Sequence, residues 1–108
     1  MDDREFQNAA DACLARVAKW LEGLDSDDAD YATADGSVTI EFPDGMKFIL
    51  SRQSATNQIW LAAAAHGYRY DYDPARDTWL DDKDHHELYA RIAELISDHV
   101  GHPIEFKG

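Results

Sequence analysis

A run of acidic residues in the first third of the chain has the clearest potential for chemistry. It holds five carboxylates, which we call the acidic segment: Glu22, Asp25, Asp27, Asp28 and Asp30. Carboxylate oxygens are hard ligands that suit iron(II), iron(III), manganese, magnesium or calcium. The segment lacks the fixed spacing, the glycine and the terminal glutamate of an EF-hand loop. It predicts several metal sites of modest affinity and poor selectivity, and the alternative is a solvated acidic edge without metal.

Two other groups of acidic residues are weaker metal candidates. Asp3 lies on the first turn of a predicted helix, roughly 28 Å from Glu22 at about 1.5 Å per residue, so the two cannot share one ion. The run Asp81-Asp82-Lys83-Asp84-His85-His86 has the composition of a metal cluster. Neighbouring residues on a helix diverge by about 100°, so His85 and His86 do not chelate as an i, i+4 pair would. We interpret this run as a charged entrance to a helix.

A tryptophan in a predicted strand at residues 58–62 is the second candidate feature. Side chains alternate along a strand, so Ile59 and Leu61 share one face while Trp60 and Gln58 share the other. The aliphatic pair predicts the core face, which places the Trp60 indole on the open face among polar neighbours. Tryptophan is enriched at binding hot spots. The alternative is an indole that packs against long side chains of neighbouring strands.

Composition and charge restrict the classes of function. The chain of 108 residues carries a formal net charge of −12 and is expected to form one domain, residues 1–108. An acidic surface repels phosphates, so nucleic acid is not an expected partner, whereas metal cations or a basic protein surface are. No apolar run approaches the ~18 residues of a membrane span. The acidic start of the chain is unlike a secretory or transit signal. We expect a soluble, cytoplasmic protein.

No motif of an enzyme active site is present in the sequence. There is no glycine-flanked serine, no phosphate-binding loop and no convincing cysteine–histidine arrangement. Cys13, the only cysteine, lies on the apolar stripe of a predicted helix and is expected to be a buried small hydrophobe. We therefore predict no catalytic residues and no enzymatic activity.

The elements that position these residues follow from periodicity. Apolar residues at steps of three and four predict helices at 3–24 and 84–100, the second capped by Asp84 with Glu87 as its capping-box partner. Between them, residues 25–31 form a loop or a short edge strand, and His66-Gly67 is a turn. Alternation and turn motifs predict strands at 38–42, 46–50, 58–62, 68–72 and 78–80. Tight turns imply an antiparallel meander, giving a two-layer α+β sandwich with both helices on one sheet face.

Several motifs follow one another along most of the chain. They are the acidic segment, the strand Val38–Phe42, the turn Pro43-Asp44-Gly45, Arg52-Gln53 followed by Asn57-Gln58-Ile59-Trp60-Leu61, and His66-Gly67-Tyr68 with Trp79 downstream. Their order and spacing resemble the frataxin family in its bacterial, CyaY-like form. The resemblance implies the same α+β sandwich fold.

The resemblance also implies a function. It implies an iron-binding accessory and regulator of iron–sulfur cluster assembly that docks on the cysteine desulfurase and donates or senses iron. Its partners would be the desulfurase and the scaffold machinery, and it would be a monomer that can oligomerise with iron. Weakly held iron, Fe2+ or Fe3+, would meet the acidic segment. The sheet-face contact with the partner would be formed by Arg52, Gln53, Asn57, Gln58 and Trp60.

One departure from the family and two alternative functions are also apparent. Many bacterial members carry extra carboxylates where this chain has Ala18 and Lys19, which argues against a high iron stoichiometry. The first alternative is a metal-independent acidic domain that binds a basic partner. The second is an iron oxidase, which is disfavoured because the sequence has no Glu-x-x-His pair of the di-iron helical bundles.

Overall fold

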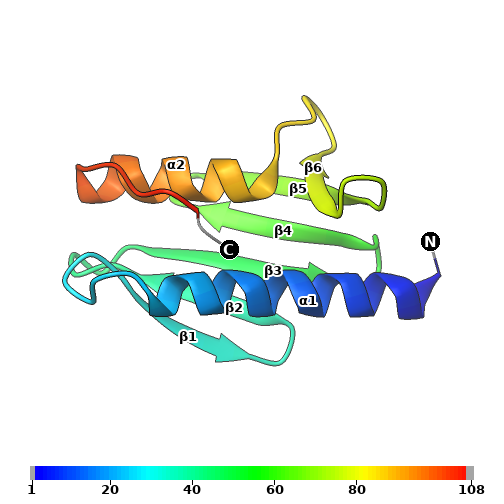
Figure 1. Ribbon diagram of the computed structural model, residues 1–108, viewed down its shortest axis with the longest axis horizontal. Helices are drawn as coiled ribbons and strands as arrows, with labels where there is room; N and C mark the ends of the chain where they lie inside the picture. Colours follow the sequence, from blue (N-terminus) through cyan, green and yellow to red (C-terminus); the bar gives the residue numbers. More distant parts are fainter. Residues whose placement is uncertain (1, 107–108) are drawn as a thin grey trace.

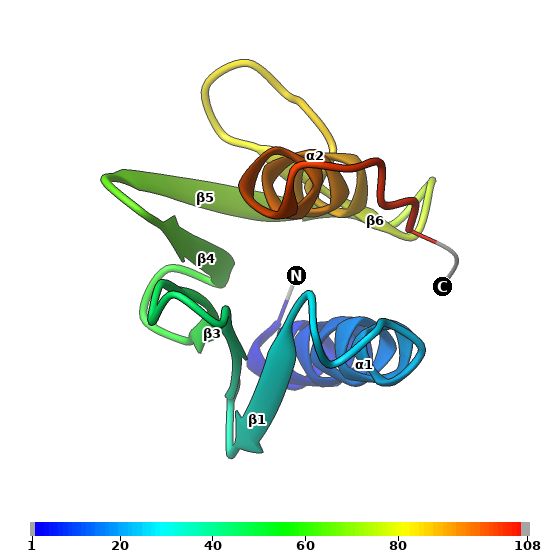
Figure 2. The ribbon, with the colours of Figure 1, turned by 90° about the vertical axis from the view of Figure 1, so that its left-hand side faces the viewer.

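The chain forms two layers, a six-stranded sheet and two helices that cover one face of it (Figures 1 and 2). The computed structural model describes residues 2–106. The helices are α1 (Asp3–Glu22) and α2 (Leu88–Val100). The strands are β1 (Asp30–Ala34), β2 (Ser37–Glu41), β3 (Lys47–Gln53), β4 (Gln58–Ala63), β5 (His66–Asp73) and β6 (Thr78–Asp81). The predicted α+β sandwich is confirmed.

The sheet is a simple meander, as the turn motifs predicted. Its strands lie in the order β1-β2-β3-β4-β5-β6, and every neighbouring pair is antiparallel. Asp35 and Gly36 form the two-residue connection between β1 and β2, where Gly36 has a φ of +77° that glycine adopts without a steric penalty. The short connections leave no room for crossovers, so strands far apart in sequence never pair.

The hydrophobic core lies between the helices and the sheet. The apolar stripe of α1 faces it with Phe6, Ala10, Cys13 and Val17. Trp79 of β6 is 1% exposed and meets Phe6 edge-to-face, with the ring centroids 6.1 Å apart. Cys13 is buried as predicted, and desolvation raises the pKa of its thiol to about 12. It is therefore protonated at neutral pH and serves as a core residue.

The C-terminal tail packs back onto both helices. The Phe106 ring lies 4.8 Å from the Trp20 ring of α1 and 4.6 Å from the Tyr89 ring of α2. The Trp20 Nε1–H donates to the Glu105 carbonyl at 2.9 Å, and Ser97 Oγ accepts from the Ile104 N–H at 2.8 Å. These contacts dock the tail onto both helices.

The start of the second helix differs from the prediction. Helix α2 begins at Leu88, and its N-cap is Glu87, whose side chain accepts from the Ala90 N–H at 2.8 Å. Asp84 is therefore not the cap. His85 adopts a left-handed φ of +62°, which an α-helix cannot contain, and Glu87 forms a bridge with Leu80 at the end of β6. These contacts hold residues 82–86 as a loop.

Two other segments also have boundaries that differ from the prediction. The turn between β4 and β5 is made by Ala64 and Ala65, with Ala64 at a φ of +55°, and His66 and Gly67 belong to β5. The run at residues 25–31 divides into a loop and the first residues of the edge strand β1.

Neither helix of the described chain is long and apolar enough to cross a membrane.

Candidate functional site

The acidic segment occupies the connection from the end of α1 to the start of β1. Glu22 is the last residue of α1 and Asp30 the first of β1. The intervening turn is held by the Asp28 N–H, which donates to the Asp25 carbonyl at 2.9 Å, and by the Asp27 N–H, which donates to Asp25 Oδ1 at 2.9 Å. A buried alanine at position 29 anchors the loop to the core. The segment is thus an ordered, exposed edge.

Most of the negative charge at this edge is not neutralised. Asp28 alone has a basic neighbour, because the His102 Nε2 lies 2.9 Å from its Oδ1. This hydrogen bond raises the pKa of His102 above its ordinary value. Within residues 2–106, no basic group lies within 4 Å of the carboxylates of Glu22, Asp25, Asp27 or Asp30. Their charge is therefore free to attract a cation or a basic surface.

The carboxylates of the acidic segment do not converge on one point. In the described part of the chain, no three of them come within 4.8 Å of one another. The segment therefore provides no closed ligand cage, in line with its irregular spacing in the sequence. Asp3 lies at the opposite end of α1 (Figure 1), so it is too distant to join the segment, as predicted.

Trp60 lies on the open face of the sheet, opposite the helices. Its neighbours in β4, Ile59 and Leu61, are fully buried on the helix side, whereas Trp60 is half-buried. The Arg69 guanidinium of β5 lies over the indole at 4.9 Å from the ring, and the indole N–H donates to Gln58 Oε1 at 3.1 Å. The open-face placement is thus correct, and the indole also packs against a long side chain of a neighbouring strand.

Of the four other predicted contact residues, three lie beside this tryptophan or on its face. Gln58 donates through Nε2 to Asp71 Oδ1 and to Asp82 Oδ2, both at 3.1 Å, which links β4 to β5 and to the loop that follows β6. Gln53 pairs with Gln58 across the β3–β4 ladder. Asn57 sits in the preceding turn with a φ of +52°. Gln53, Gln58 and Trp60 are therefore one continuous surface, with Asn57 at its edge.

Arg52 points to the other side of the sheet. It pairs with the buried Ile59 in the ladder, and its side chain is only 15% exposed. Its guanidinium forms an ion pair with Asp11 of α1 and lies 3.6 Å from a carboxylate oxygen of Asp35. The expected sheet-face position of Arg52 is thus wrong, because β3 continues to Gln53 and alternation turns Arg52 toward α1.

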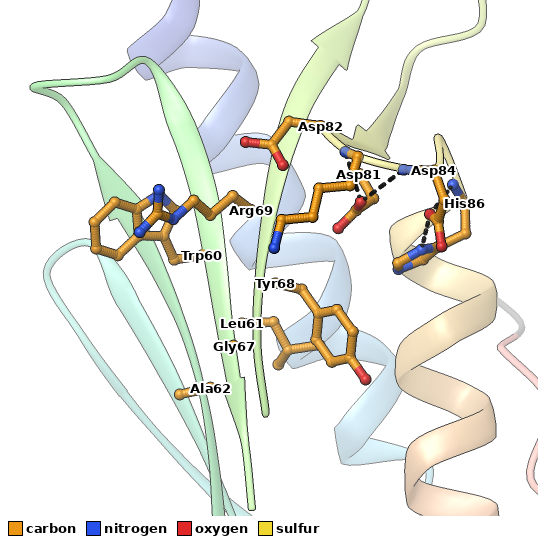
Figure 3. Close-up of a pocket in the computed structure, with 11 residues that line it drawn as sticks. Trp60, Leu61, Ala62, Gly67, Tyr68, Arg69, Asp81, Asp82, Asp84 and His86 are labelled. Atoms are coloured by element: carbon orange, nitrogen blue, oxygen red, sulfur yellow. Dashed lines mark hydrogen bonds and ion pairs between the residues drawn. The ribbon is translucent and has the colours of Figure 1, made fainter. Parts of the chain in front are cut away.

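The structure adds residues that the sequence argument did not single out. Arg69 and Asp71 belong to the open face, and Ile49 is 41% exposed on the same face. Each of them alternates with buried neighbours along its strand, a pattern from which the sequence could have predicted its place on the open face. A hollow of about 460 Å³ lies between this face and the loop before α2 (Figure 3).

That loop and the last residue of β6 contain the one group of three metal-ligand side chains found in residues 2–106. Asp81, Asp84 and His86 offer ligand atoms that all lie within 4.8 Å of one another. The interpretation of the run as the entrance of a helix is therefore replaced by a folded loop. The sequence did not reveal this grouping, because the left-handed φ at His85 interrupts the helical geometry that a helical wheel assumes.

Comparisons with known proteins agree with this architecture. The model of the frataxin-like domain matches residues 1–102. The chain is 40% identical over 105 residues to the iron–sulfur cluster assembly protein CyaY of Dechloromonas aromatica (strain RCB), covering 96% of this chain and 97% of that protein. It is also similar to the solved structure of frataxin from Psychromonas ingrahamii, with a TM-score of 0.88, 29% identity and full coverage of both chains. Fold, sequence and family match together show that the chain belongs to the frataxin-like family.

Proposed function

We propose that this protein is an iron-binding accessory of iron–sulfur cluster assembly, acting in the cytoplasm. In this proposal it docks on the cysteine desulfurase and donates or senses iron. The observation that carries the proposal is the acidic segment, where four exposed carboxylates project without a basic neighbour among the described residues. The similarity to an iron–sulfur cluster assembly protein over nearly the whole chain supports the same role.

The acidic segment would serve both iron and the partner. Carboxylates that do not converge hold a cation weakly and through water, which allows iron to be released again. The same charges steer the protein toward a basic patch on the desulfurase, since complementary charge accelerates association. Both contributions weaken as salt increases, because exposed charges are screened over about 10 Å at 0.1 M ionic strength.

The open face of the sheet would supply the specific contact. Trp60, Gln58, Gln53 and Asn57 form the centre of this surface in our proposal, and Arg69 supports the indole. A half-buried tryptophan flanked by polar groups is a common hot spot of protein interfaces. Arg52 is left out of the contact because its side chain is engaged with α1.

An anaerobic iron(II) titration followed by amide NMR tests the metal role. We expect shifted or broadened amides at residues 22–30, with magnesium much less effective. The variant Asp27→Asn/Asp30→Asn should lose these changes and should weaken binding to the desulfurase at low salt. The matched control Asp71→Asn removes one carboxylate at the other end of the sheet and should leave the iron response of residues 22–30 unchanged.

The second candidate is a metal-independent acidic interaction domain. The lack of convergence among the carboxylates of the acidic segment favours it. It leads if no amide of residues 22–30 responds to iron, or if magnesium acts equally, while binding to the desulfurase persists without iron.

A further inference from the structure

The loop between β6 and α2 gathers side chains of mixed chemistry that the proposed function does not use. Asp81 ends β6, while Asp84 and His86 lie in the loop that follows. Figure 3 shows the carboxylate of Asp84 and the ring of His86 turned toward each other, with Asp81 beside them at the rim of the hollow. Two carboxylates and one imidazole within 4.8 Å form a set of ligands quite unlike the acidic segment.

Asp81 is a buried carboxylate with one oxygen held and one oxygen available. The residue is 4% exposed. Its Oδ1 accepts from the Lys83 N–H at 2.8 Å and from the Asp84 N–H at 3.1 Å. Its Oδ2 makes no hydrogen bond or ion pair with any residue from 2 to 106. Every fully buried side-chain oxygen or nitrogen of these residues has a partner, so the unpartnered Oδ2 retains contact with solvent. Asp81 is one of the residues that line the hollow.

His86 is oriented by contacts on both ring nitrogens. Its Nδ1 lies 2.5 Å from Asp84 Oδ1, and its Nε2 lies 2.8 Å from Tyr70 Oη. Tyr70 is fully buried in β5, and its ring meets the imidazole edge-to-face at 5.3 Å. The ring is therefore held in one orientation by a rigid part of the sheet. A histidine whose second nitrogen is held in this way is the usual arrangement of a metal ligand.

We propose that Asp81, Asp84 and His86 bind one divalent first-row transition-metal ion at the edge of this hollow. Oδ2 of Asp81, a carboxylate oxygen of Asp84 and Nδ1 of His86 are the protein ligands. The ion takes the place of the hydrogen on Nδ1. The neutral ring then carries its single hydrogen on Nε2, and this N–H donates to Tyr70 Oη. Water completes the coordination from the hollow. Two oxygens and one nitrogen favour Fe2+, Co2+, Mn2+ or Zn2+ over Mg2+ and Ca2+, which prefer oxygen alone.

The contact between Asp84 and His86 must open slightly before an ion can bind both. Adjacent ligands at about 2.1 Å in an octahedral site lie about 3 Å apart, so Asp84 Oδ1 must move away from Nδ1 by about half an ångström. Asp84 has an exposed side chain in a loop, which permits this shift. The alternative is a purely structural loop in which Asp84 and His86 only bond each other.

This site is separate from the acidic segment and does not rest on the proposed function. It lies beside the N-terminal end of α2, whereas the acidic segment follows the C-terminal end of α1, at the left-hand end of the view in Figure 1. An ion here is oriented by a buried aspartate and a fixed imidazole, so it is bound more selectively than at scattered surface carboxylates.

Titration of the full chain with Co2+ tests the proposal, with calorimetry for affinity and the visible absorption of Co2+ for its ligands. We expect one site with a d–d band altered by nitrogen ligation, and no competition by equimolar Mg2+. His86→Gln should weaken this site tenfold or more, and Asp84→Asn should do so at an exposed position that does not endanger folding. Tyr70→Phe, which keeps the ring and removes the acceptor, should weaken it about tenfold.

The matched control is His85→Gln, which removes the neighbouring imidazole outside the group and should leave Co2+ affinity unchanged. Asp27→Asn/Asp30→Asn should also leave it unchanged, which separates this site from the acidic segment. The proposal is overturned if wild type shows no Co2+ site with nitrogen ligation, or if Mg2+ competes equally. It is also overturned if both His86→Gln and Asp84→Asn keep the wild-type affinity while folded.

Discussion

The His102 imidazole, beyond the end of α2, lies 2.9 Å from the Asp28 carboxylate in the acidic segment, 74 residues earlier in the chain. This contact ties the C-terminal tail to the candidate iron-binding edge. It also makes one carboxylate of the segment different from the other four, since Asp28 is the only one with a basic partner among the described residues.

The pKa of His102 should depend on Asp28. The hydrogen bond to Asp28 raises the pKa of His102, so the folded protein holds this proton more tightly than the unfolded chain. The resulting stabilisation is complete below the unfolded pKa of about 6.5 and is lost as pH rises through the higher folded pKa. Asp28→Asn should lower the pKa of His102 in an NMR pH titration. Asp44→Asn, beside His99, is the control and should not change it.

Arg52 should contribute to folding. Its guanidinium joins β3 to α1 through Asp11, with the arginine mostly buried and the aspartate half-exposed. We expect Arg52→Ala to lower the free energy of unfolding by about 1–2 kcal/mol in chemical denaturation. A double-mutant cycle with Asp11→Ala should give a coupling of about 0.5–1 kcal/mol. Arg76→Ala, at a largely exposed arginine, should change stability by less than about 0.5 kcal/mol. Equal effects of the two arginine variants would contradict this role.

Trp60 should matter more for partner binding than for folding. Because it is half-buried on the open face, Trp60→Ala should cost about 1 kcal/mol of stability. It should weaken binding to the desulfurase by about 2 kcal/mol, or roughly thirtyfold, as expected of a hot spot. Met46→Ala changes a large apolar side chain that is exposed in the β2–β3 turn, and it is the matched control for binding. Binding that survives in Trp60→Ala but not in Met46→Ala would place the contact elsewhere.

Glu87 should stabilise the second helix, and Asp84 should not in the absence of metal. Glu87 accepts from the Ala90 N–H at the first turn of α2 and from the Thr78 hydroxyl of β6. Glu87→Ala should therefore lower stability by about 1–2 kcal/mol, as for loss of an N-cap. Asp84→Ala, measured in the presence of a chelator, should cost clearly less. Thermal melts of the two variants decide between the caps, and the reverse order would restore Asp84 as the cap.

Local patterns in the sequence were enough to predict much of the fold. Alternation of apolar residues and the turn motifs predicted an antiparallel meander, because a strand exposes its side chains with a period of two whatever its neighbours are. The apolar stripe of α1 likewise predicted the burial of Cys13, because the helical period also depends only on the local sequence. The exposed charge of the acidic segment also follows from the sequence alone, since five carboxylates within nine residues cannot be buried together.

Only the tertiary structure decided which distant side chains meet. The direction of Arg52 depended on how far β3 extends, which is decided by its pairing with β4 through Gln53 and Gln58. The approach of His102 to Asp28 depended on how the tail leaves α2. The grouping of Asp81, Asp84 and His86 required a left-handed residue at His85 and the buried Tyr70 beneath the ring. Periodicity encodes the face of one element, whereas these contacts arise where several elements close around a loop.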